Sequence, residues 1–138
     1  EAERVKVNYG SALPNQVGET ESVGLTQIGR TDPRPLRRRA LCAIIEARVQ
    51  ELLQMVKKEL LRVNCADKMR AGVVLTGGGS LLHGMTDCAA EILQAPARLG
   101  MPIGGGGLSD AVEGPEFSTA VGLVLYAVKV EESAHPVK

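Results

Sequence analysis

The longest regular pattern of apolar positions runs from Leu36 to about Val63. Apolar residues recur there at spacings of three and four, which places them on one stripe of a helix of about seven turns. The heptad repeat of a coiled coil is not kept over enough turns, so the pattern predicts a long helix that packs on a core. The apolar positions are Leu41, Ile44, Ile45, Val49, Leu52, Leu53, Val56, Leu60 and Val63.

Two shorter elements are predicted before this helix. Residues 1–8 have the pattern of a helix that ends at Gly10, because glycine commonly terminates helices and Pro14 prevents continuation. Residues 11–35 are polar and contain several glycines and prolines. Within them, residues 22–28 alternate between polar and apolar positions, which predicts a half-buried strand with a bulge at Gly24.

After residue 71 the pattern changes to short apolar runs that are separated by glycine. Residues 72–76 predict a strand buried on both faces, as in parallel sheets. A glycine turn follows, and then a helix over residues 81–93, a strand over residues 97–101 and a final helix over residues 117–130. The order strand, turn, helix, strand is a β–α–β pattern, so the predicted fold class is α/β.

Composition excludes several classes of function. The chain has 138 residues, about one domain, and only three aromatic residues, so base-stacking nucleic-acid binding is not expected. Three cysteines and two histidines without metal-ligand spacing predict reduced thiols rather than a zinc site or a disulfide framework. The sequence has neither a signal-peptide pattern nor a membrane-spanning apolar run, which favours a cytosolic setting.

The net charge of zero hides an asymmetry. Residues 1–70 carry 13 Lys and Arg against 9 Asp and Glu, whereas residues 71–138 carry 3 against 7. Twelve of the 16 glycines follow residue 70. We therefore expect two regions with different roles, residues 1–70 and 71–130, followed by a flexible tail over residues 131–138.

The first candidate for binding chemistry is the glycine turn Gly77-Gly78-Gly79-Ser80. Glycines after a strand let the backbone approach a ligand, and the free N–H groups of the following helix favour phosphate. The turn matches neither the P-loop nor the dinucleotide-binding glycine pattern. A plain strand-to-helix turn, which also needs glycine, is the alternative interpretation.

The second candidate is a helical face that carries Glu3, Lys6 and Gly10. Residues at i, i+3 and i+7 share one side of a helix. A carboxylate can accept hydrogen bonds from ribose hydroxyls, a lysine stem can lie along a purine, and the glycine would leave room for a flat group. The alternative is an ordinary surface ion pair between Glu3 and Lys6.

The third candidate is the arginine cluster Arg34, Arg37, Arg38 and Arg39, at the predicted start of the long helix. Positive charge is unfavourable at a helix N-terminus, so an acidic peptide or an anionic surface would stabilise it there. A solvated basic face is the alternative. No catalytic set of Ser, His, Asp or Cys residues and no convergent carboxylate pair is visible, so no catalytic residue and no metal ligand is assigned.

Several motifs occur together in an order that resembles one family. Residues 2–10 (AERVKVNYG) resemble a helix of bacterial actin-like proteins, and residues 74–84 (VLTGGGSLLHG) resemble the adenosine motif of the actin and heat-shock chaperone ATPase superfamily. Residues 107–110 (GLSD) and 118–123 (STAVGL) resemble the second connecting motif. The GLSD form, with Pro33-Arg34 and Arg39, resembles the FtsA family of cell-division proteins more than the rod-shape or pilus-assembly families.

The resemblance implies an actin-like ATPase fold, which is ribonuclease H-like and binds ATP with Mg²⁺ between two lobes. This chain would be a fragment of the second lobe. Residues 1–70 would form its outer subdomain, and residues 71–130 would close its inner subdomain. The residues assigned to the nucleotide on this basis are Glu3, Lys6, Gly10, Gly77, Gly78, Gly79, Ser80 and Leu81.

The resemblance also implies partners and a location. Family members dock the C-terminal tail of the tubulin-like protein FtsZ, assemble into actin-like filaments and link the FtsZ ring to the membrane. They lie at the cytoplasmic face of the inner membrane at the division site. The arginine cluster would face the tail, and membrane attachment is expected only through segments missing here, because residues 130–138 lack the pattern of a basic amphipathic helix.

A second departure from the family pattern concerns catalysis, and two hypotheses on function stay open. The two Asp-x-Gly loops that hold Mg²⁺ and phosphate in this superfamily are absent, so we expect no ATP hydrolysis by this chain alone. Under the first hypothesis the chain is part of a nucleotide-binding lobe. Under the second it is an interaction module around residues 11–70, which binds a division partner without useful nucleotide affinity.

Overall fold

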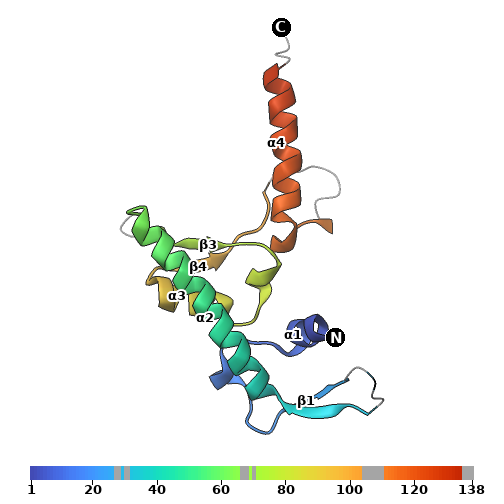
Figure 1. Cartoon of the computed structure of the whole chain (residues 1–138). Coiled ribbons are helices and arrows are strands. Elements are labelled where there is room, and N and C mark those ends of the chain that lie inside the picture. Colours follow the sequence, from blue (N-terminus) through green and yellow to red (C-terminus); the bar gives the residue numbers. More distant parts are fainter. Residues whose placement is uncertain (27–28, 30–31, 66–68, 70, 104–110, 135–138) are drawn as a thin grey trace. The chain divides into compact units, whose positions relative to one another are not determined.

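A computed structural model describes residues 1–26, 29, 32–65, 69, 71–103 and 111–134. Helices and strands alternate along the chain, which confirms the α/β class (Figure 1). The chain forms two compact units. The first contains Glu1–Val73 and Leu82–Ala97, and the second contains Val74–Leu81 and Arg98–Lys138.

The first unit begins with helix α1, Ala2–Tyr9, which confirms the predicted N-terminal helix. Its last turn closes at Gly10, whose N–H donates to the carbonyl of Lys6 (2.8 Å). Val5 is the buried residue of α1. A single 3₁₀ turn, η1 (Pro14–Gln16), follows and packs against the long helix of this unit.

Strands β1, Ser22–Leu25, and β2, Arg34–Arg37, form an antiparallel pair. The register pairs the residues one to one, including Gly24 with Pro35, so the predicted bulge at Gly24 is wrong. The prediction of a helix from Leu36 is also corrected. Pairing with β1 holds Leu36 and Arg37 in extended conformation, and the helix begins at Arg38, two residues later than predicted.

Helix α2, Arg38–Arg62, is the long helix that the apolar pattern predicts. It ends in a left-handed residue, Asn64 (φ 53°), whose N–H donates to the Leu61 carbonyl (3.1 Å). The next N–H, from Cys65, donates to the Leu60 carbonyl (2.9 Å). These two bonds form a Schellman motif, which satisfies carbonyls that the helix itself leaves unpaired.

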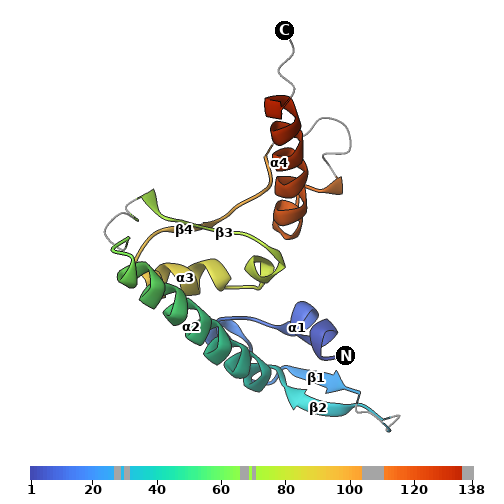
Figure 2. The ribbon, with the colours of Figure 1, turned by 45° about the horizontal axis from the view of Figure 1, so that its top comes forward.

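Helix α3, Met85–Leu93, packs along α2, and the two helices lie side by side in both views (Figures 1 and 2). Apolar side chains from both helices make the core of the first unit. The Nζ of Lys57 donates to the Ile92 carbonyl (2.8 Å) near the end of α3. The buried residues of the two helices are Cys42, Val49 and Leu53 on α2 and Cys88, Ala89 and Leu93 on α3.

Strands β3, Val73–Leu75, and β4, Ala97–Leu99, flank α3 in sequence and pair with each other. The N–H of Val73 donates to the Pro96 carbonyl, and the N–H of Gly100 donates to the Leu75 carbonyl, both at 2.7 Å. The two strands therefore advance in the same direction, which confirms the parallel β–α–β unit. Burial of β3 on both faces is not observed, because Val74 is exposed.

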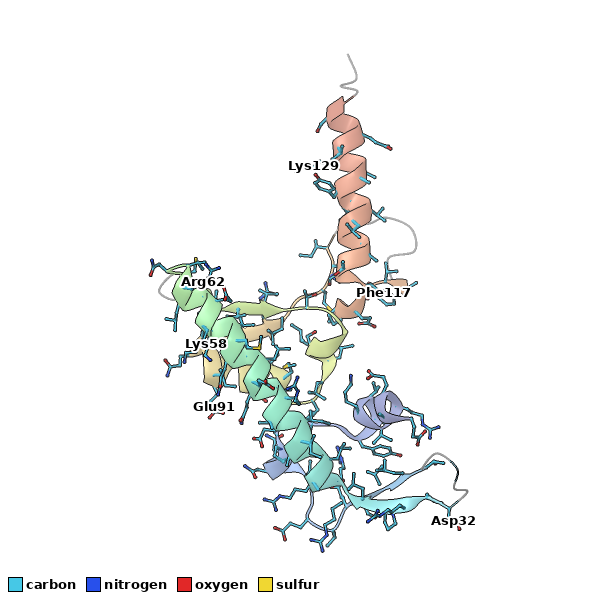
Figure 3. The ribbon with its side chains drawn as sticks, in the orientation of Figure 1. Asp32, Lys58, Arg62, Glu91, Phe117 and Lys129 are labelled. Carbon is cyan, nitrogen blue, oxygen red and sulfur yellow. The ribbon has the colours of Figure 1, made fainter. Side chains whose placement is uncertain are left out.

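The second unit also contains two 3₁₀ turns, η3 (Gly78–Leu81) and η5 (Pro115–Phe117), and helix α4, Ser118–Ala134. Helix α4 is longer than the predicted 117–130. Its side chains project on all sides, Lys129 among them (Figure 3), and most of its large apolar ones are exposed. Thr76 ties the end of β3 to the start of α4, because its hydroxyl lies 2.6 Å from that of Ser118.

Candidate functional site

The glycine turn of the second unit is open at the positions that side chains would occupy. Gly77 has φ +84°, a conformation that favours glycine, and no atom of the residues that the structure describes lies within 4 Å of a Cβ placed there or at Gly79. A Cβ at Gly78 would meet the side chain of Glu116, at 3.8 Å. The turn therefore has room for a ligand to approach the backbone closely.

Hydrogen bonds within the glycine turn and to Pro115 fix its shape. The N–H of Gly77 donates to the Pro115 carbonyl (2.9 Å), and the hydroxyl of Ser80 donates to the Gly77 carbonyl (2.7 Å). Ser80 is buried, so its hydroxyl shapes the turn. Leu81 is exposed and offers an apolar surface beside the turn.

The face of α1 that carries Glu3 and Lys6 lies in the first unit. The two side chains form an ion pair (2.7 Å) and both are exposed, as in the simpler interpretation of this pattern. Gly10 does not leave a free space for a flat group, because a Cβ there would meet the Ile45 side chain (2.9 Å). Glycine at this position is explained by close packing on α2, and a role of the three residues in ligand binding stays a prediction.

The four arginines of the predicted cluster lie in two different elements. Arg34 and Arg37 belong to β2 and are exposed, whereas Arg38 and Arg39 open α2. Since side chains alternate along a strand and Arg34 pairs with Leu25, Arg34 and Arg37 lie on opposite faces of the hairpin. The expectation that all four start a helix is therefore wrong.

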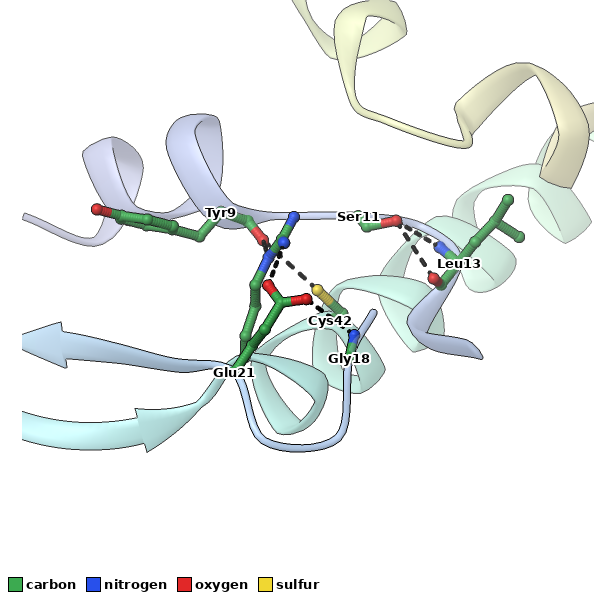
Figure 4. Close-up of polar contacts among 7 residues, drawn as sticks. Tyr9, Ser11, Leu13, Gly18, Glu21 and Cys42 are labelled. Atoms are coloured by element: carbon green, nitrogen blue, oxygen red, sulfur yellow. Dashed lines mark hydrogen bonds and ion pairs between the residues drawn. The ribbon is translucent and has the colours of Figure 1, made fainter. Parts of the chain in front are cut away.

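Two of these arginines are already paired with carboxylates of the same unit. Arg39 contacts Glu19 (2.8 Å), and Arg38 contacts Glu21 (2.6 Å). The second oxygen of Glu21 accepts the N–H of Gly18 (2.9 Å), as Figure 4 shows. The hydrogen bond from Arg38, followed by that from Gly18, holds the pKa of the Glu21 carboxyl below its usual value.

A second stripe of α2 was not recognised as a separate surface from the sequence. We define the outer stripe of α2 as Ile44, Arg48, Leu52 and Met55, about a third of a turn around the helix from its buried residues. The three apolar members are 65%, 55% and 61% exposed. Arg48 lies among them, with its side chain 76% exposed and paired with Glu51.

The sequence did contain a signal for the outer stripe of α2. The predicted apolar stripe contains Ile44 and Leu52 together with the buried Val49, and the full set spans more than one face of a helix. An apolar sector that is wider than one contact surface indicates that the helix has two apolar neighbours. The described elements that pack on α2, with α3 and η1 chief among them, leave Ile44, Leu52 and Met55 exposed, so the outer stripe is open.

The residues that the structure describes contain neither a metal-binding group nor a membrane-spanning helix. No group of three or more His, Cys, Asp and Glu side chains is placed to hold a metal ion among them. In the same residues, no helix combines the length and apolar character that crossing a membrane requires.

Comparison with known proteins shows the family. Residues 1–122 match the family described as cell division protein FtsA. The chain is 41% identical over 128 residues to the cell division protein FtsA of Pseudomonas aeruginosa, covering 93% of this chain and 31% of that protein. It is 39% identical over 135 residues to that of Escherichia coli K12, covering 91% and 32%, and 38% identical over 138 residues to that of Rhizobium meliloti, covering 98% and 31%. The chain thus spans about a third of the length of these relatives, and it belongs to the FtsA family of cell division proteins.

Proposed function

We propose that this chain acts in bacterial cell division as part of an actin-like, ATP-binding protein that connects the FtsZ ring to the membrane. Within that protein, this chain binds the C-terminal tail of FtsZ. Self-association into filaments at the cytoplasmic face of the inner membrane, at the division site, belongs to the same proposal. The family match supports the process, and the outer stripe of α2 supports the docking function.

The outer stripe of α2 has the chemistry that a mixed acidic and apolar peptide needs. Ile44, Leu52 and Met55 offer exposed apolar contact area, and Arg48 offers a guanidinium between them. The partner of Arg48 is the exposed Glu51, three residues away, and such surface pairs are weak. A peptide carboxylate can therefore replace Glu51 at little cost.

The arginine cluster now contributes less to this proposal than the sequence suggested. Arg38 and Arg39 already form ion pairs with Glu21 and Glu19. A peptide carboxylate would have to displace these side chains, which would offset part of its binding free energy. Arg34 and Arg37 point to opposite faces of the hairpin, and one bound segment contacts at most one of them directly. The outer stripe of α2 is therefore the preferred docking surface, and Arg34 is a secondary contact.

A matched pair of arginines on α2 tests the docking surface. Arg48 and Arg62 are similarly exposed (76% and 71%), and each pairs with a glutamate three residues away. We expect Arg48→Glu to weaken binding of a labelled FtsZ-tail peptide at least about tenfold at low salt, because it replaces an attraction by a repulsion. Arg62→Glu lies about 20 Å further along the helix and is expected to leave the affinity unchanged.

Fluorescence anisotropy of the peptide measures both variants and the wild type. Leu52→Asp adds a test of the apolar contact, and circular dichroism verifies that each variant is folded. Equal loss of affinity in Arg48→Glu and Arg62→Glu would indicate unspecific attraction to a basic surface. Unchanged affinity in both Arg48→Glu and Leu52→Asp would show that the peptide does not bind at the outer stripe of α2.

The second candidate function is a contribution to an ATP site, and the open glycine turn favours it. Gly77, Gly78 and Gly79 would lie along the phosphate and ribose, and Leu81 would border the adenine. On α1, Glu3 and Lys6 would exchange their ion pair for contacts with ribose and adenine. Loops outside this sequence would have to hold Mg²⁺ and the outer phosphates, so the chain alone is expected to release no phosphate from ATP.

Nucleotide affinity is the measurement for this second candidate. In a protein of the relatives' full length that contains this chain, Gly78→Val is expected to abolish ATP binding, because a branched side chain would fill the space above the turn. Lys6→Ala is expected to weaken binding without changing stability, since Lys6 is exposed. Unchanged ATP affinity in the double variant would contradict the assignment of these residues.

A further inference from the structure

The end of α1 is held by hydrogen bonds from outside the helix. The carbonyl of Tyr9 belongs to the last turn, where an α-helix leaves its carbonyls without partners. It accepts a hydrogen bond from Nε of Arg38 (2.9 Å), and the Sγ of Cys42 lies at 3.6 Å from the same oxygen (Figure 4). Both donors come from the first two turns of α2.

The guanidinium of Arg38 is fixed in this position by a second set of contacts. Its Nη1 donates to Glu21 at 2.6 Å, and the other oxygen of Glu21 accepts the N–H of Gly18. The backbone N–H of Arg38 also donates to the Glu21 carbonyl (2.9 Å). Its side chain is only 27% exposed, the least among the cations of the ion pairs in the described residues.

Close packing supports the same contact between α1 and α2. A Cβ at Gly10 would meet the Ile45 side chain at 2.9 Å, so the chain after α1 lies directly on α2. Arg38, Cys42 and Ile45 follow at i, i+4 and i+7 and therefore share one face of α2. The C-terminal end of α1 therefore packs on one face of the first two turns of α2.

We propose that Arg38 is a positioning residue that fastens α1 to α2. Helix α1 has only eight residues and one buried side chain, and a helix this short is not stable by itself. Its orientation, and with it that of the Glu3 and Lys6 face, depends on the contacts at its C-terminal end. If the proposed ATP function of this face holds, Arg38 also couples a nucleotide on α1 to the helix that docks the partner.

Amide hydrogen exchange on the 138-residue chain tests the positioning role without any ligand. In Arg38→Gln the amides of residues 6–10 are expected to exchange about tenfold faster, because the charged donor to Tyr9 and the pair with Glu21 are both lost. The amides around Val49 and Leu53 in the core of α2 are expected to keep their protection. Arg39→Gln is the matched control, since the Arg39 contacts reach Glu19 and Asn15 and not α1.

Two further variants separate positioning from a general loss of stability. Glu21→Gln keeps the Arg38 bond to Tyr9 and is expected to raise the exchange of residues 6–10 by a smaller factor than Arg38→Gln. Arg38→Lys is expected to fall between wild type and Arg38→Gln, because an ammonium cannot reproduce the planar fork that reaches both oxygens.

Three results would overturn the positioning role. The first is wild-type exchange of residues 6–10 in Arg38→Gln, and the second is the same acceleration in Arg39→Gln. The third is an equal acceleration throughout α2 and α3 in both Arg38→Gln and Glu21→Gln, which would assign the ion pair to overall stability. These outcomes need neither peptide nor nucleotide, so they are distinguishable from a failure of the proposed docking or ATP functions.

Discussion

Replacing Gly84 with alanine is expected to destabilise the first unit by about 3 kcal/mol. Gly84 precedes α3 and has φ +77°, where a side chain costs about 1–2 kcal/mol. A Cβ there would also lie 2.6 Å from Cγ of Leu13, and such overpacking costs about 1–3 kcal/mol. The lower entropy of the unfolded alanine chain offsets about 0.4–1 kcal/mol of this loss.

Leu13 has little freedom to move away from the new side chain. Its N–H donates to the hydroxyl of Ser11 (3.0 Å), and Ser11 is fully buried. The neighbouring Ala12 N–H donates to the His83 carbonyl (2.8 Å), directly before Gly84. Because both sides of the contact are held by hydrogen bonds, the strain cannot be relieved by a small shift of one segment.

Two other glycines of the same unit separate the two causes. Gly29 has φ +81°, and no described residue lies within 4 Å of its Cβ position, so Gly29→Ala is expected to carry mainly the backbone strain. Gly10 has φ −71°, and a Cβ there would clash with the Lys6 carbonyl oxygen and lie 2.9 Å from the Ile45 side chain, so Gly10→Ala carries overpacking without the strain of a positive φ. Gly29→Ala is expected to cost less than Gly84→Ala, because it lacks the contact with Leu13.

Urea unfolding followed by far-UV circular dichroism measures all three variants. With a typical slope of about 1–3 kcal/mol per molar, the Gly84→Ala midpoint is expected to fall by about 1–3 M. A change in the free energy of unfolding below about 0.5 kcal/mol, the usual range for surface changes, would refute the reasoning. If Gly84→Ala loses no more unfolding free energy than Gly29→Ala, the Leu13 side chain moves away from the new methyl group without cost.

Two more predictions concern polar contacts of the first unit. Lys57→Met is expected to cost about 1 kcal/mol in urea unfolding, because the Ile92 carbonyl loses its donor, while the exposed Lys58→Met should be neutral. Since Arg38 lowers the pKa of Glu21 in the folded state, the stabilisation from this pair is complete above the unfolded carboxyl pKa and is lost as pH falls through the folded value. Between neutral and acidic pH, Glu21→Gln should therefore lose less free energy of unfolding than wild type. Plots of unfolding free energy against pH that run parallel for the two proteins would contradict this.

Local patterns of the sequence determined the fold class and most of the elements. A helix such as α2 follows from apolar residues at spacings of three and four, and the parallel β–α–β unit follows from short apolar runs around a helical segment. These signals are local because each element makes its own hydrogen bonds or shows its own buried face. The ordered motifs also identified the FtsA family correctly from the sequence.

Only the tertiary structure decided how the charged residues are used. Leu36 and Arg37 became a strand because β1 supplies a ladder partner, which a helical pattern does not reveal. Arg38 and Arg39 met Glu21 and Glu19 across 17 and 20 residues of chain, so these pairs depend on the path of the loop and not on helical spacing.

The exposure of the outer stripe of α2 is also decided by the tertiary structure. The sequence shows that α2 is apolar on a wide sector, and packing alone decides that α3 covers Val49 and Leu53 while Leu52 stays open. Burial is a property of pairs of elements, whereas periodicity is a property of one element. For this reason the sequence predicted the elements and the family, and the structure was needed to propose the docking surface and the role of Arg38.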